Sequence, residues 1–273
     1  INYDINYFMY INDLNPVLIN LNFIEVRWYS LAYVFGILIG WWIAKKIVLF
    51  KIKNKIIVFD VDLFDDLITY IIISMIVGGR IGYVVFYNFS YYLDNPFNIL
   101  KVWEGGMSFH GALIGIIIGT YLFSKKMRVN LFFFLDIVAS VAPIGIFFGR
   151  IANFINSELY GKPSNFFWSV IFPRIDMVPR HPSQIYEAIL EGIVLFFILI
   201  VVILKKNIKI GICSSLFMIL YGVFRILAEQ FREPDAQIGY IFNLLSMGSL
   251  LSFAMILVGL FIFVKIKNNE IYK

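Results

Sequence analysis

The chain contains little of what soluble enzymes and metalloproteins rely on. Only 15% of its 273 residues are charged, and it has one cysteine and two histidines, whereas soluble domains carry about 25% charged residues. A single cysteine excludes an intrachain disulfide, and the lack of a Cys/His cluster argues against a zinc or iron–sulfur site. Cys213 lies in an apolar stretch, where we expect it to pack. We therefore predict no metal and no cofactor.

Apolar residues dominate instead, at 60% of the chain. Acidic residues near the N-terminus, without a basic stretch, do not resemble a cleaved signal peptide. A membrane span requires about 20 mainly apolar residues. The predicted fold class is all-α, a polytopic membrane helix bundle that forms one integral-membrane domain over residues 1–273. Its seven predicted spans are 28–44, 67–87, 109–124, 131–149, 184–204, 211–230 and 242–264.

Basic residues gather after every second predicted span. Under the positive-inside rule these clusters mark the cytoplasmic side, so we expect the N-terminus outside and the C-terminus inside. They also account for the net charge of +5 without nucleic-acid binding. The longest segment between spans, 150–183, is then a small head on the outer, periplasmic side. The clustered residues are Lys45, Lys46, Lys51, Lys53, Lys55, Lys125, Lys126, Arg128, Lys205, Lys206, Lys209, Lys265, Lys267 and Lys273.

Arginine predominates among the basic residues that remain. A guanidinium group is planar and binds phosphate or carboxylate in a bidentate way, which a lysine ammonium does not. We interpret the outer half of the protein as built to hold an anion. Placement at the membrane interface explains Arg27 and Arg174 equally well, but it is a weaker explanation for Arg80, Arg150 and Arg225.

Polar side chains inside the predicted spans fall on helical stripes. Ionisable groups in a span are costly and usually face the bundle interior or a wet cavity. One stripe joins Tyr221, Arg225, Glu229 and Arg232 at offsets of 0, 4, 8 and 11. We expect Arg225 and Glu229 to pair, which lowers the cost of burying both. Several such stripes predict a cavity for an anionic ligand, and the alternative is a polar network that only fixes helix packing.

A second stripe joins Gln184, Glu187 and Glu191. The two glutamates are like charges on one face, so each is expected to need a basic or donor partner, or a proton. Arg150 and Asn153 lie one helical turn apart near the end of the fourth predicted span. The stripes together place arginine, glutamate and amide side chains in the outer half of the bundle.

The two histidines have different surroundings. His110 stands among glycines in "GGMSFHGALIG", which leaves it open to a ligand, and an imidazole suits proton transfer near neutrality. A hydrogen-bonded packing role is the alternative. Ser108 is expected to cap the following helix. His181 precedes a proline at a predicted helix start and is expected to be structural. Arg80, in "GGRIG", is flanked by glycines that permit close helix approach.

Five motifs in order along the chain carry a resemblance to a known family. Their order and spacing run from "RWYSLAY" to "SMGSLLS" and cover nearly the whole chain. On these motifs the sequence resembles the prolipoprotein diacylglyceryl transferases. It departs from them at Ser157, where members commonly have glycine, and at Lys162, where they have arginine. The five motifs are "GGRIGYVVFYN", "VWEGGMSFHGALIG", "GRIANFINSELYG", "RHPSQIYEAILEG" and "YGVFRILAEQFREPDAQIG".

The resemblance implies an enzyme of the bacterial inner membrane, multi-pass, with its active site toward the periplasmic half. Such an enzyme transfers the diacylglyceryl group of phosphatidylglycerol to the lipobox cysteine thiol of a prolipoprotein. A thioether forms and glycerol phosphate leaves. The implied partners are phosphatidylglycerol, the prolipoprotein signal peptide with its lipobox cysteine, and the lipid bilayer. Because the nucleophile belongs to the peptide, the enzyme needs no cysteine of its own.

The motifs and the stripes together assign roles to ten residues. Arg150 and Arg225 are expected to bind the phosphate. His110 is the first candidate for the base, with Glu229 or an arginine-linked network as the rival. A secondary transporter of an organic phosphate or other anion is the alternative function, but it requires a polar route to the cytoplasm that the sequence does not indicate. A non-catalytic lipid-binding scaffold is a further alternative. The expected substrate-binding residues are Tyr29, Arg80, Asn153, Glu158, Tyr221 and Arg232.

Overall fold

The computed structural model describes residues 9–21, 25–57, 59–102, 105–234, 240–241 and 245–267. Most of these residues are helical, and within them six helices are long and apolar enough to cross a membrane. The predicted helical, multi-pass membrane protein is thus confirmed, whereas the count of seven spans and the orientation stay predictions. The six are Trp28–Lys53, Val61–Tyr87, Leu131–Asn156, Ser183–Ile203, Ile212–Glu229 and Gly248–Lys267.

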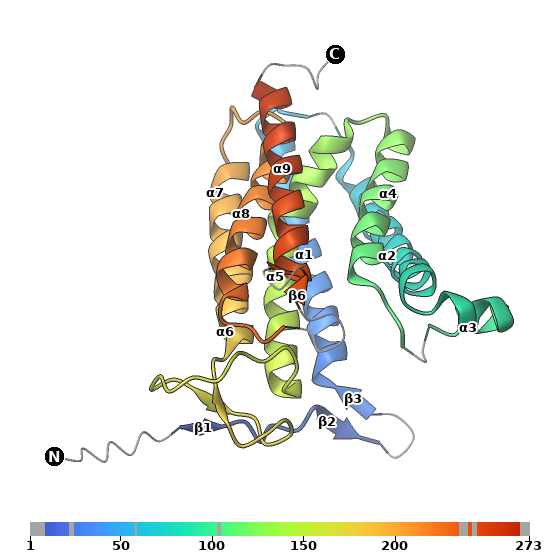
Figure 1. Ribbon diagram of the computed structural model, residues 1–273. Coiled ribbons are helices and arrows are strands. Elements are labelled where there is room, and N and C mark those ends of the chain that lie inside the picture. Colours follow the sequence, from blue (N-terminus) through green and yellow to red (C-terminus); the bar gives the residue numbers. More distant parts are fainter. Residues whose placement is uncertain are drawn as a thin grey trace. The chain divides into compact units, whose positions relative to one another are not determined.

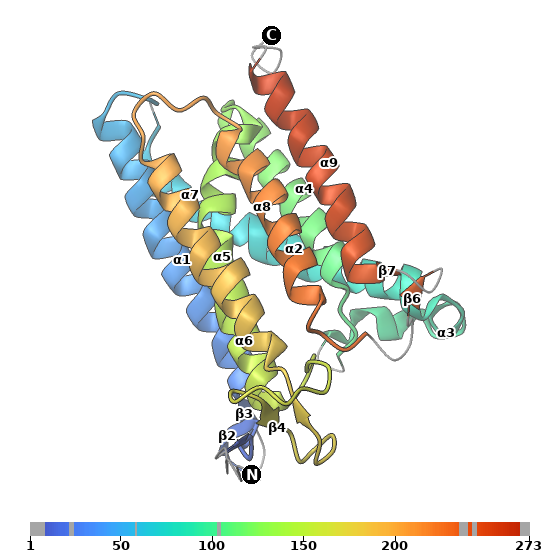
Figure 2. The ribbon, with the colours of Figure 1, turned by 60° about the vertical axis from the view of Figure 1, so that its left-hand side comes forward.

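The chain divides into two compact units, one of residues 1–44 and 138–273 and the other of residues 45–137. In the first unit the long helices run side by side, and the strands β1 to β5 lie at one end of them (Figure 1, Figure 2). Its elements are β1 (Tyr10–Ile11), β2 (Val17–Asn20), β3 (Glu25–Arg27), α1 (Trp28–Lys53), α5 (Leu131–Asn156), β4 (Val170–Ile171), β5 (Pro179–Arg180), α6 (Ser183–Glu187), η4 (Ala188–Val194), α7 (Leu195–Ile203), α8 (Ile212–Glu229), β6 (Tyr240–Ile241), β7 (Leu245–Ser246) and α9 (Met247–Lys267). The helices α1 and α5 each continue into the second unit.

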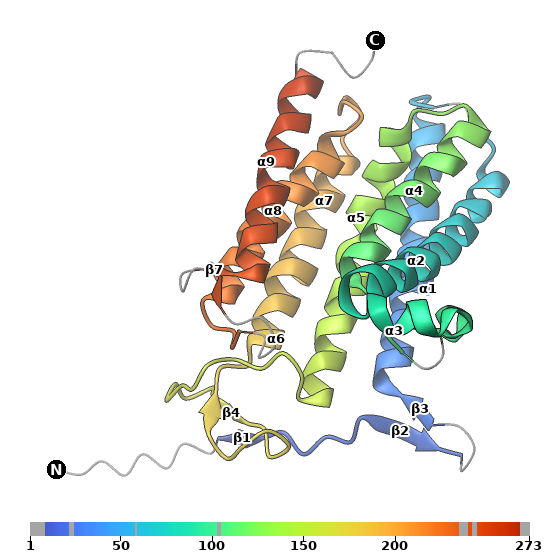
Figure 3. The ribbon, with the colours of Figure 1, turned by 45° about the vertical axis from the view of Figure 1, so that its right-hand side comes forward.

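The second unit is organised around one close helix pair, α2 and α4 (Figure 3). A Cβ atom on Gly78 would lie 2.9 Å from the Cα of Gly115, and one on Gly82 would lie 2.8 Å from the Cα of Gly111. Glycines at four-residue intervals let two backbones approach closely inside a membrane. The expected close approach beside Arg80 is therefore confirmed. The unit contains η1 (Val61–Leu63), α2 (Phe64–Tyr87), α3 (Phe89–Asp94), η2 (Pro96–Leu100) and α4 (Phe109–Met127).

Two helices extend beyond the predicted ends of their spans. The helix α1 continues to Lys53 instead of ending at residue 44, because residues 45–53 contain no glycine or proline and lysine favours helix. The helix α5 continues to Asn156 instead of ending at residue 149. Arg150 and Asn153 therefore belong to the body of a helix, whose regular backbone fixes the direction of both side chains.

The segment 157–182, between α5 and α6, forms a small head. In it β4 pairs in parallel with β1 and antiparallel with β5. The ring of His181 lies among Phe166, Tyr186 and Phe231, and burial lowers its pKa, which favours the neutral ring. The amide of Gly161 donates to the His181 carbonyl at 3.0 Å, and a Cβ atom on Gly161 would lie 2.7 Å from that of His181. These contacts agree with a structural role for His181.

Candidate active site

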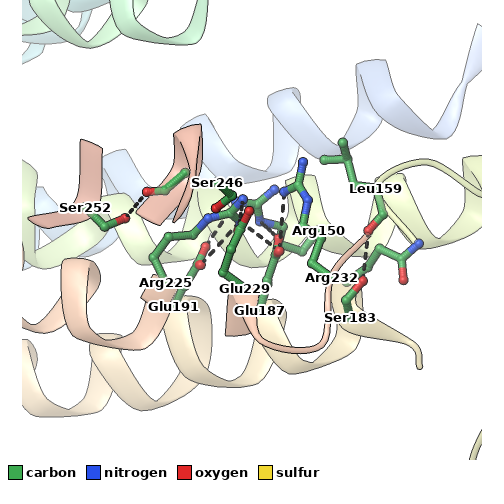
Figure 4. Close-up of polar contacts among 12 residues, drawn as sticks. Arg150, Leu159, Ser183, Glu187, Glu191, Arg225, Glu229, Arg232, Ser246 and Ser252 are labelled. Atoms are coloured by element: carbon green, nitrogen blue, oxygen red, sulfur yellow. Dashed lines mark hydrogen bonds and ion pairs between the residues drawn. The ribbon is translucent and has the colours of Figure 1, made fainter. Parts of the chain in front are cut away.

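Two arginines from different helices meet two glutamates of a third segment (Figure 4). Arg150 extends from α5 and Arg225 from α8, whereas Glu187 ends α6 and Glu191 lies in η4. The Nε of Arg150 is 2.8 Å from Glu187 Oε2, and its Nη2 is 3.1 Å from Glu191 Oε2. The Nη1 of Arg225 is 2.7 Å from Glu187 Oε1 and 3.7 Å from Glu191 Oε1. Each carboxylate therefore lies near both guanidinium groups.

Two further residues complete what we call the arginine–glutamate cluster. Arg225 Nη2 lies 2.8 Å from Glu229 Oε2, which confirms their expected pairing. Arg232 Nη1 lies 3.4 Å from Glu187 Oε1. The basic partners expected for Glu187 and Glu191 are thus present, and the charges of the cluster balance when all of its groups are ionised. Its six members are Arg150, Glu187, Glu191, Arg225, Glu229 and Arg232.

The cluster is buried, yet some of its closest contacts are not hydrogen bonds. The side chains of Glu187 and Glu191 are 0% exposed. Among the residues that the structure describes, the buried Nε of Arg150 and Nη1 of Arg225 have no hydrogen-bond partner, although both lie within ion-pair distance of Glu187. These contacts rest on charge rather than on well-directed hydrogen bonds. Because buried donors are costly to leave unpaired, the cluster gains when an anionic ligand accepts from them.

Glu158 is held at the end of α5 by two asparagines. Its carboxylate accepts hydrogen bonds from Asn153 Nδ2 at 3.0 Å and Asn156 Nδ2 at 3.3 Å. Its backbone carbonyl accepts from Gln184 Nε2 at 2.6 Å, three residues before Glu187 on α6. The structure thus brings Asn153 and Glu158 together and joins them to the segment that carries the two buried glutamates.

The departure at Ser157 has a structural meaning. Its φ is 59°, in the left-handed region that favours glycine, and Leu159 has a φ of 54°. A serine there carries conformational strain that a glycine avoids. At the other departure, the side chain of Lys162 donates from its Nζ to the Gln230 carbonyl at 3.0 Å.

The two tyrosines expected to bind substrate lie on separate helices. Tyr221 is buried on α8, one turn before Arg225, and stacks on Phe217 with ring centroids 5.6 Å apart. Tyr29 lies in the first turn of α1 and packs against Tyr33 with centroids 5.2 Å apart. Tyr221 thus shares a helix with the arginine–glutamate cluster, whereas the described ring contact of Tyr29 is within its own helix.

Arg80 and His110 belong to the second unit. Arg80 uses its five N–H groups on the carbonyls of five residues: Asn98, Ile99, Lys101, Gly105 and Gly106. In this conformation it holds the segment between α2 and α4 and keeps no N–H for a ligand. Ser108 caps α4 as expected, with its Oγ accepting from the Gly111 amide at 3.2 Å. His110 is the second residue of α4, and its side chain lies outside the described residues.

Sequence reasoning left three residues of this arrangement out of its candidate site. Gln184, Glu187 and Glu191 are all 0% exposed in the structure. The signal was available, because acids four residues apart in an apolar run are rarely tolerated without partners. What the sequence could not supply was the partner helix.

Among the described residues no group of three or more His, Cys, Asp or Glu is arranged to hold a metal ion.

Comparison with known proteins places the chain in a family. A family profile described as "Prolipoprotein diacylglyceryl transferase" matches residues 16–265. The chain belongs to the prolipoprotein diacylglyceryl transferase family. Relatives named phosphatidylglycerol–prolipoprotein diacylglyceryl transferase include one from Rickettsia bellii, 49% identical over 263 residues that cover 96% of this chain and 98% of the relative. Another, from Rickettsia felis, is 51% identical over 249 residues that cover 90% and 95%.

A relative from Rickettsia typhi carries the same name and is 48% identical over 263 residues, which cover 96% of this chain and 100% of the relative. The predicted family and the predicted transferase class are therefore confirmed. The roles of individual residues stay predictions.

Proposed function

We propose that the chain transfers the diacylglyceryl group of phosphatidylglycerol to the cysteine thiol of a lipobox in a prolipoprotein signal peptide. In this reaction the bond breaks between the phosphate oxygen and the glycerol carbon of the diacylglyceryl group. The electron pair of that bond stays on the phosphate oxygen. The thiol sulfur bonds to that carbon and gives up its proton. The products are a thioether and glycerol phosphate.

The observation that carries this proposal is the pairing of Arg150 and Arg225 across two buried carboxylates. Negative charge grows on the phosphate as the bond breaks, and preorganised donors in a water-poor site stabilise such charge most strongly. The Nε of Arg150 and Nη1 of Arg225, which are ion-paired with Glu187 but make no hydrogen bond among the described residues, are suited to phosphate oxygens. Asn153, Glu158, Tyr221, Tyr29 and Arg232 are assigned to substrate positioning, whereas Arg80, first expected to bind substrate, is assigned to holding the segment between α2 and α4.

Charge balance gives the proton of the thiol a destination. The arginine–glutamate cluster has no net charge when all six groups are ionised, so a phosphate bound there gains from one additional positive charge. When one carboxylate accepts the thiol proton it becomes neutral, and the cluster as a whole then has one net positive charge. Glu229 is one candidate for this carboxylate: it is only 9% exposed and pairs with Arg225 at 2.8 Å. His110 is the other candidate base, because imidazole is the most common general base in enzymes. The pH dependence of kcat/KM in His110→Gln and Glu229→Gln variants separates the two, since only the true base removes a limb of the profile.

The proposed setting is the bacterial inner membrane, with the site toward the periplasmic half. The clusters of lysine after alternate spans support this orientation. The head at 157–182 follows the helix that carries Arg150, so it lies at the same end of its unit as Asn153 and Glu158. A signal peptide that approaches from this end would present its thiol beside those residues.

The test uses the purified chain in lipid nanodiscs with phosphatidylglycerol and a synthetic lipobox peptide. Release of glycerol phosphate should require the peptide, and a matched peptide with serine in place of cysteine should give none. No release with either peptide would refute the transferase. Counterflow of an organic phosphate by proteoliposomes would instead favour a transporter.

A further inference from the structure

The membrane-spanning segment Ser183–Ile203 is not one regular α-helix. It begins as α6, becomes a π-helix over η4 (Ala188–Val194), and continues as α7. Hydrogen bonds in a π-helix join residues five apart, so its turns are wider than those of an α-helix. Such turns are rare and often occur at functional sites. Here the wide turns contain Glu191 and directly follow Glu187.

The wide turns keep one face of the segment pointing into its unit. Five residues buried to 2% exposure or less recur every four positions, and the equally buried Gln184 and Ala188 lie beside this series. The five are Glu187, Glu191, Leu195, Leu199 and Ile203. In an α-helix of 3.6 residues per turn, each step of four residues drifts by about 40° around the axis. The π-helical turns hold an extra residue and offset this drift. Both carboxylates and the apolar stripe below them therefore share a face.

The same turns allow α5 to come close. A Cβ atom added to Gly192 in η4 would lie 2.7 Å from the Cβ of Phe147 and 3.0 Å from its Cα. Phe147 lies three residues before Arg150, about one helical turn away on α5. The contact between Gly192 and Phe147 thus sets the distance across which Arg150 reaches Glu187 and Glu191.

Glu191 lies where two like charges must be held together. Its Oε2 is 3.1 Å from Arg150 Nη2 and its Oε1 is 3.7 Å from Arg225 Nη1. Two guanidinium groups near each other repel, and a carboxylate between them offsets that repulsion. Glu187 contacts the same arginines, but it also contacts Arg232. Glu191 thus lies between Arg150 and Arg225.

We infer that the π-helical turn Ala188–Val194 is a positioning element for phosphate binding, and that Glu191 is a positioning residue that holds Arg150 and Arg225 at the spacing one phosphate group requires. This inference rests on the proposed function for its consequence, because the two arginines act on the phosphate. The positions that it assigns to Arg150 and Arg225 can be tested without measuring activity. Without the wide turn, Glu187 and Glu191 would turn around the helix axis relative to the buried stripe at Leu199 and Ile203, so both carboxylates would shift away from Arg150 and Arg225.

The experiment changes the turn without changing the charges. Deletion of Ile189, whose side chain is exposed to 45%, converts the wide turn to an α-helical one. The matched control is Ile189→Ala, which removes the same side chain and keeps the register. A second variant, Gly192→Ala, pushes α5 away through Phe147, and its control is Gly145→Ala, since a Cβ atom at Gly145 meets no atom within 4 Å. Glu191→Gln removes the charge alone.

Two measurements are made on each variant in nanodiscs. The first is kcat/KM for phosphatidylglycerol, which should fall about a hundredfold in the deletion, Gly192→Ala and Glu191→Gln variants, because a displacement of about 1 Å costs that much. The second is the rate at which phenylglyoxal labels Arg150, read by mass spectrometry. It should rise about tenfold or more when Arg150 loses a carboxylate, an expectation that follows from a loosened ion pair. Both controls should match the wild type.

The outcomes separate this inference from the proposed function. If the wild type releases no glycerol phosphate, the proposed function fails, while labelling of Arg150 still tests the geometry. If Gly192→Ala keeps kcat/KM and the labelling rate within about threefold of wild type, the inference is overturned. Should the deletion variant not fold, Gly192→Ala and Glu191→Gln decide the matter, and unchanged values in both would refute it.

Discussion

Buried arginines serve two different purposes in the two units of this protein. Arg80, in the second unit, is 4% exposed and donates to five backbone carbonyls. Arg150 and Arg225, in the first unit, are held mainly by carboxylates, and each has a buried nitrogen without a hydrogen-bond partner among the described residues. All N–H groups of Arg80 are therefore used in hydrogen bonds, whereas the charges of Arg150 and Arg225 are neutralised by carboxylates without every N–H making a hydrogen bond.

The difference lies in what a ligand would have to replace. Carbonyls of a loop are neutral and fixed by the backbone, so a phosphate that took the donors of Arg80 would leave several buried carbonyls unpaired. Carboxylate oxygens beside Arg150 and Arg225 can exchange their role with phosphate oxygens of similar charge and geometry. We therefore expect changes at Arg80 to act on stability and changes at the arginine–glutamate cluster to act on turnover.

The largest expected effect is at Arg150. Arg150→Lys keeps the charge but removes the planar donors, so kcat/KM for phosphatidylglycerol should fall about a thousandfold. The measurement is release of glycerol phosphate in nanodiscs. The matched control is Arg27→Lys, because Arg27 is 60% exposed and pairs only at the surface with Glu25. If turnover in Arg150→Lys stays within tenfold of wild type, Arg150 does not act on the phosphate through its planar donors. It would then be no more important for turnover than Arg80.

Glu187 tests whether the carboxylates are essential to the fold of the cluster. Glu187 contacts Arg150, Arg225 and Arg232, and it is fully buried. Glu187→Gln leaves their positive charge uncompensated, which should cost about 3–5 kcal/mol of unfolding free energy. Chemical unfolding in detergent measures the loss. Asp65→Asn is the control, since its partner Lys45 lies in a half-exposed surface pair. Equal unfolding free energies of the two variants would show that the cluster contributes little to the stability of the protein.

Arg80 should respond in the opposite sense. Arg80→Lys leaves at least two of the five carbonyls without a donor, because a lysine ammonium has three N–H groups. We expect a loss of about 2–3 kcal/mol in unfolding free energy, with kcat per folded molecule within about tenfold of wild type. Thermal unfolding and turnover of the same sample measure both. A thousandfold loss of kcat with unchanged stability would show that Arg80 acts on the phosphate after all.

Particular residues show how far the sequence alone could go. The pairing of Arg225 with Glu229, the cap at Ser108 and the close approach beside Arg80 were predictable because each depends on spacing within one helix or on glycine. The contacts of Arg150 with Glu187 and Glu191 were not, because they join residues of different helices that are 37 and 41 positions apart in the chain. The five carbonyls around Arg80 and the wide turn at η4 were missed for a related reason, since both depend on backbone conformation that side-chain periodicity does not reveal.

A third kind of arginine gives the smallest expected effect. In the head, Arg180 pairs with Asp176 at 2.5 Å and with Glu233 at 3.3 Å, partly in contact with solvent. Hydrogen bonding from Arg180 lowers the pKa of Asp176 below its ordinary value. A folded-state pKa below the unfolded one means that this pair stabilises at neutral pH and loses its contribution as pH falls through the lowered pKa. Asp176→Asn should therefore cost less than about 1 kcal/mol near pH 7, and thermal unfolding should show the difference shrinking as pH falls through the lowered pKa of Asp176. A difference that grows on acidification would contradict the pairing, and a cost as large as that at Glu187 would mean that solvent-facing and buried arginine pairs in this protein are not distinct.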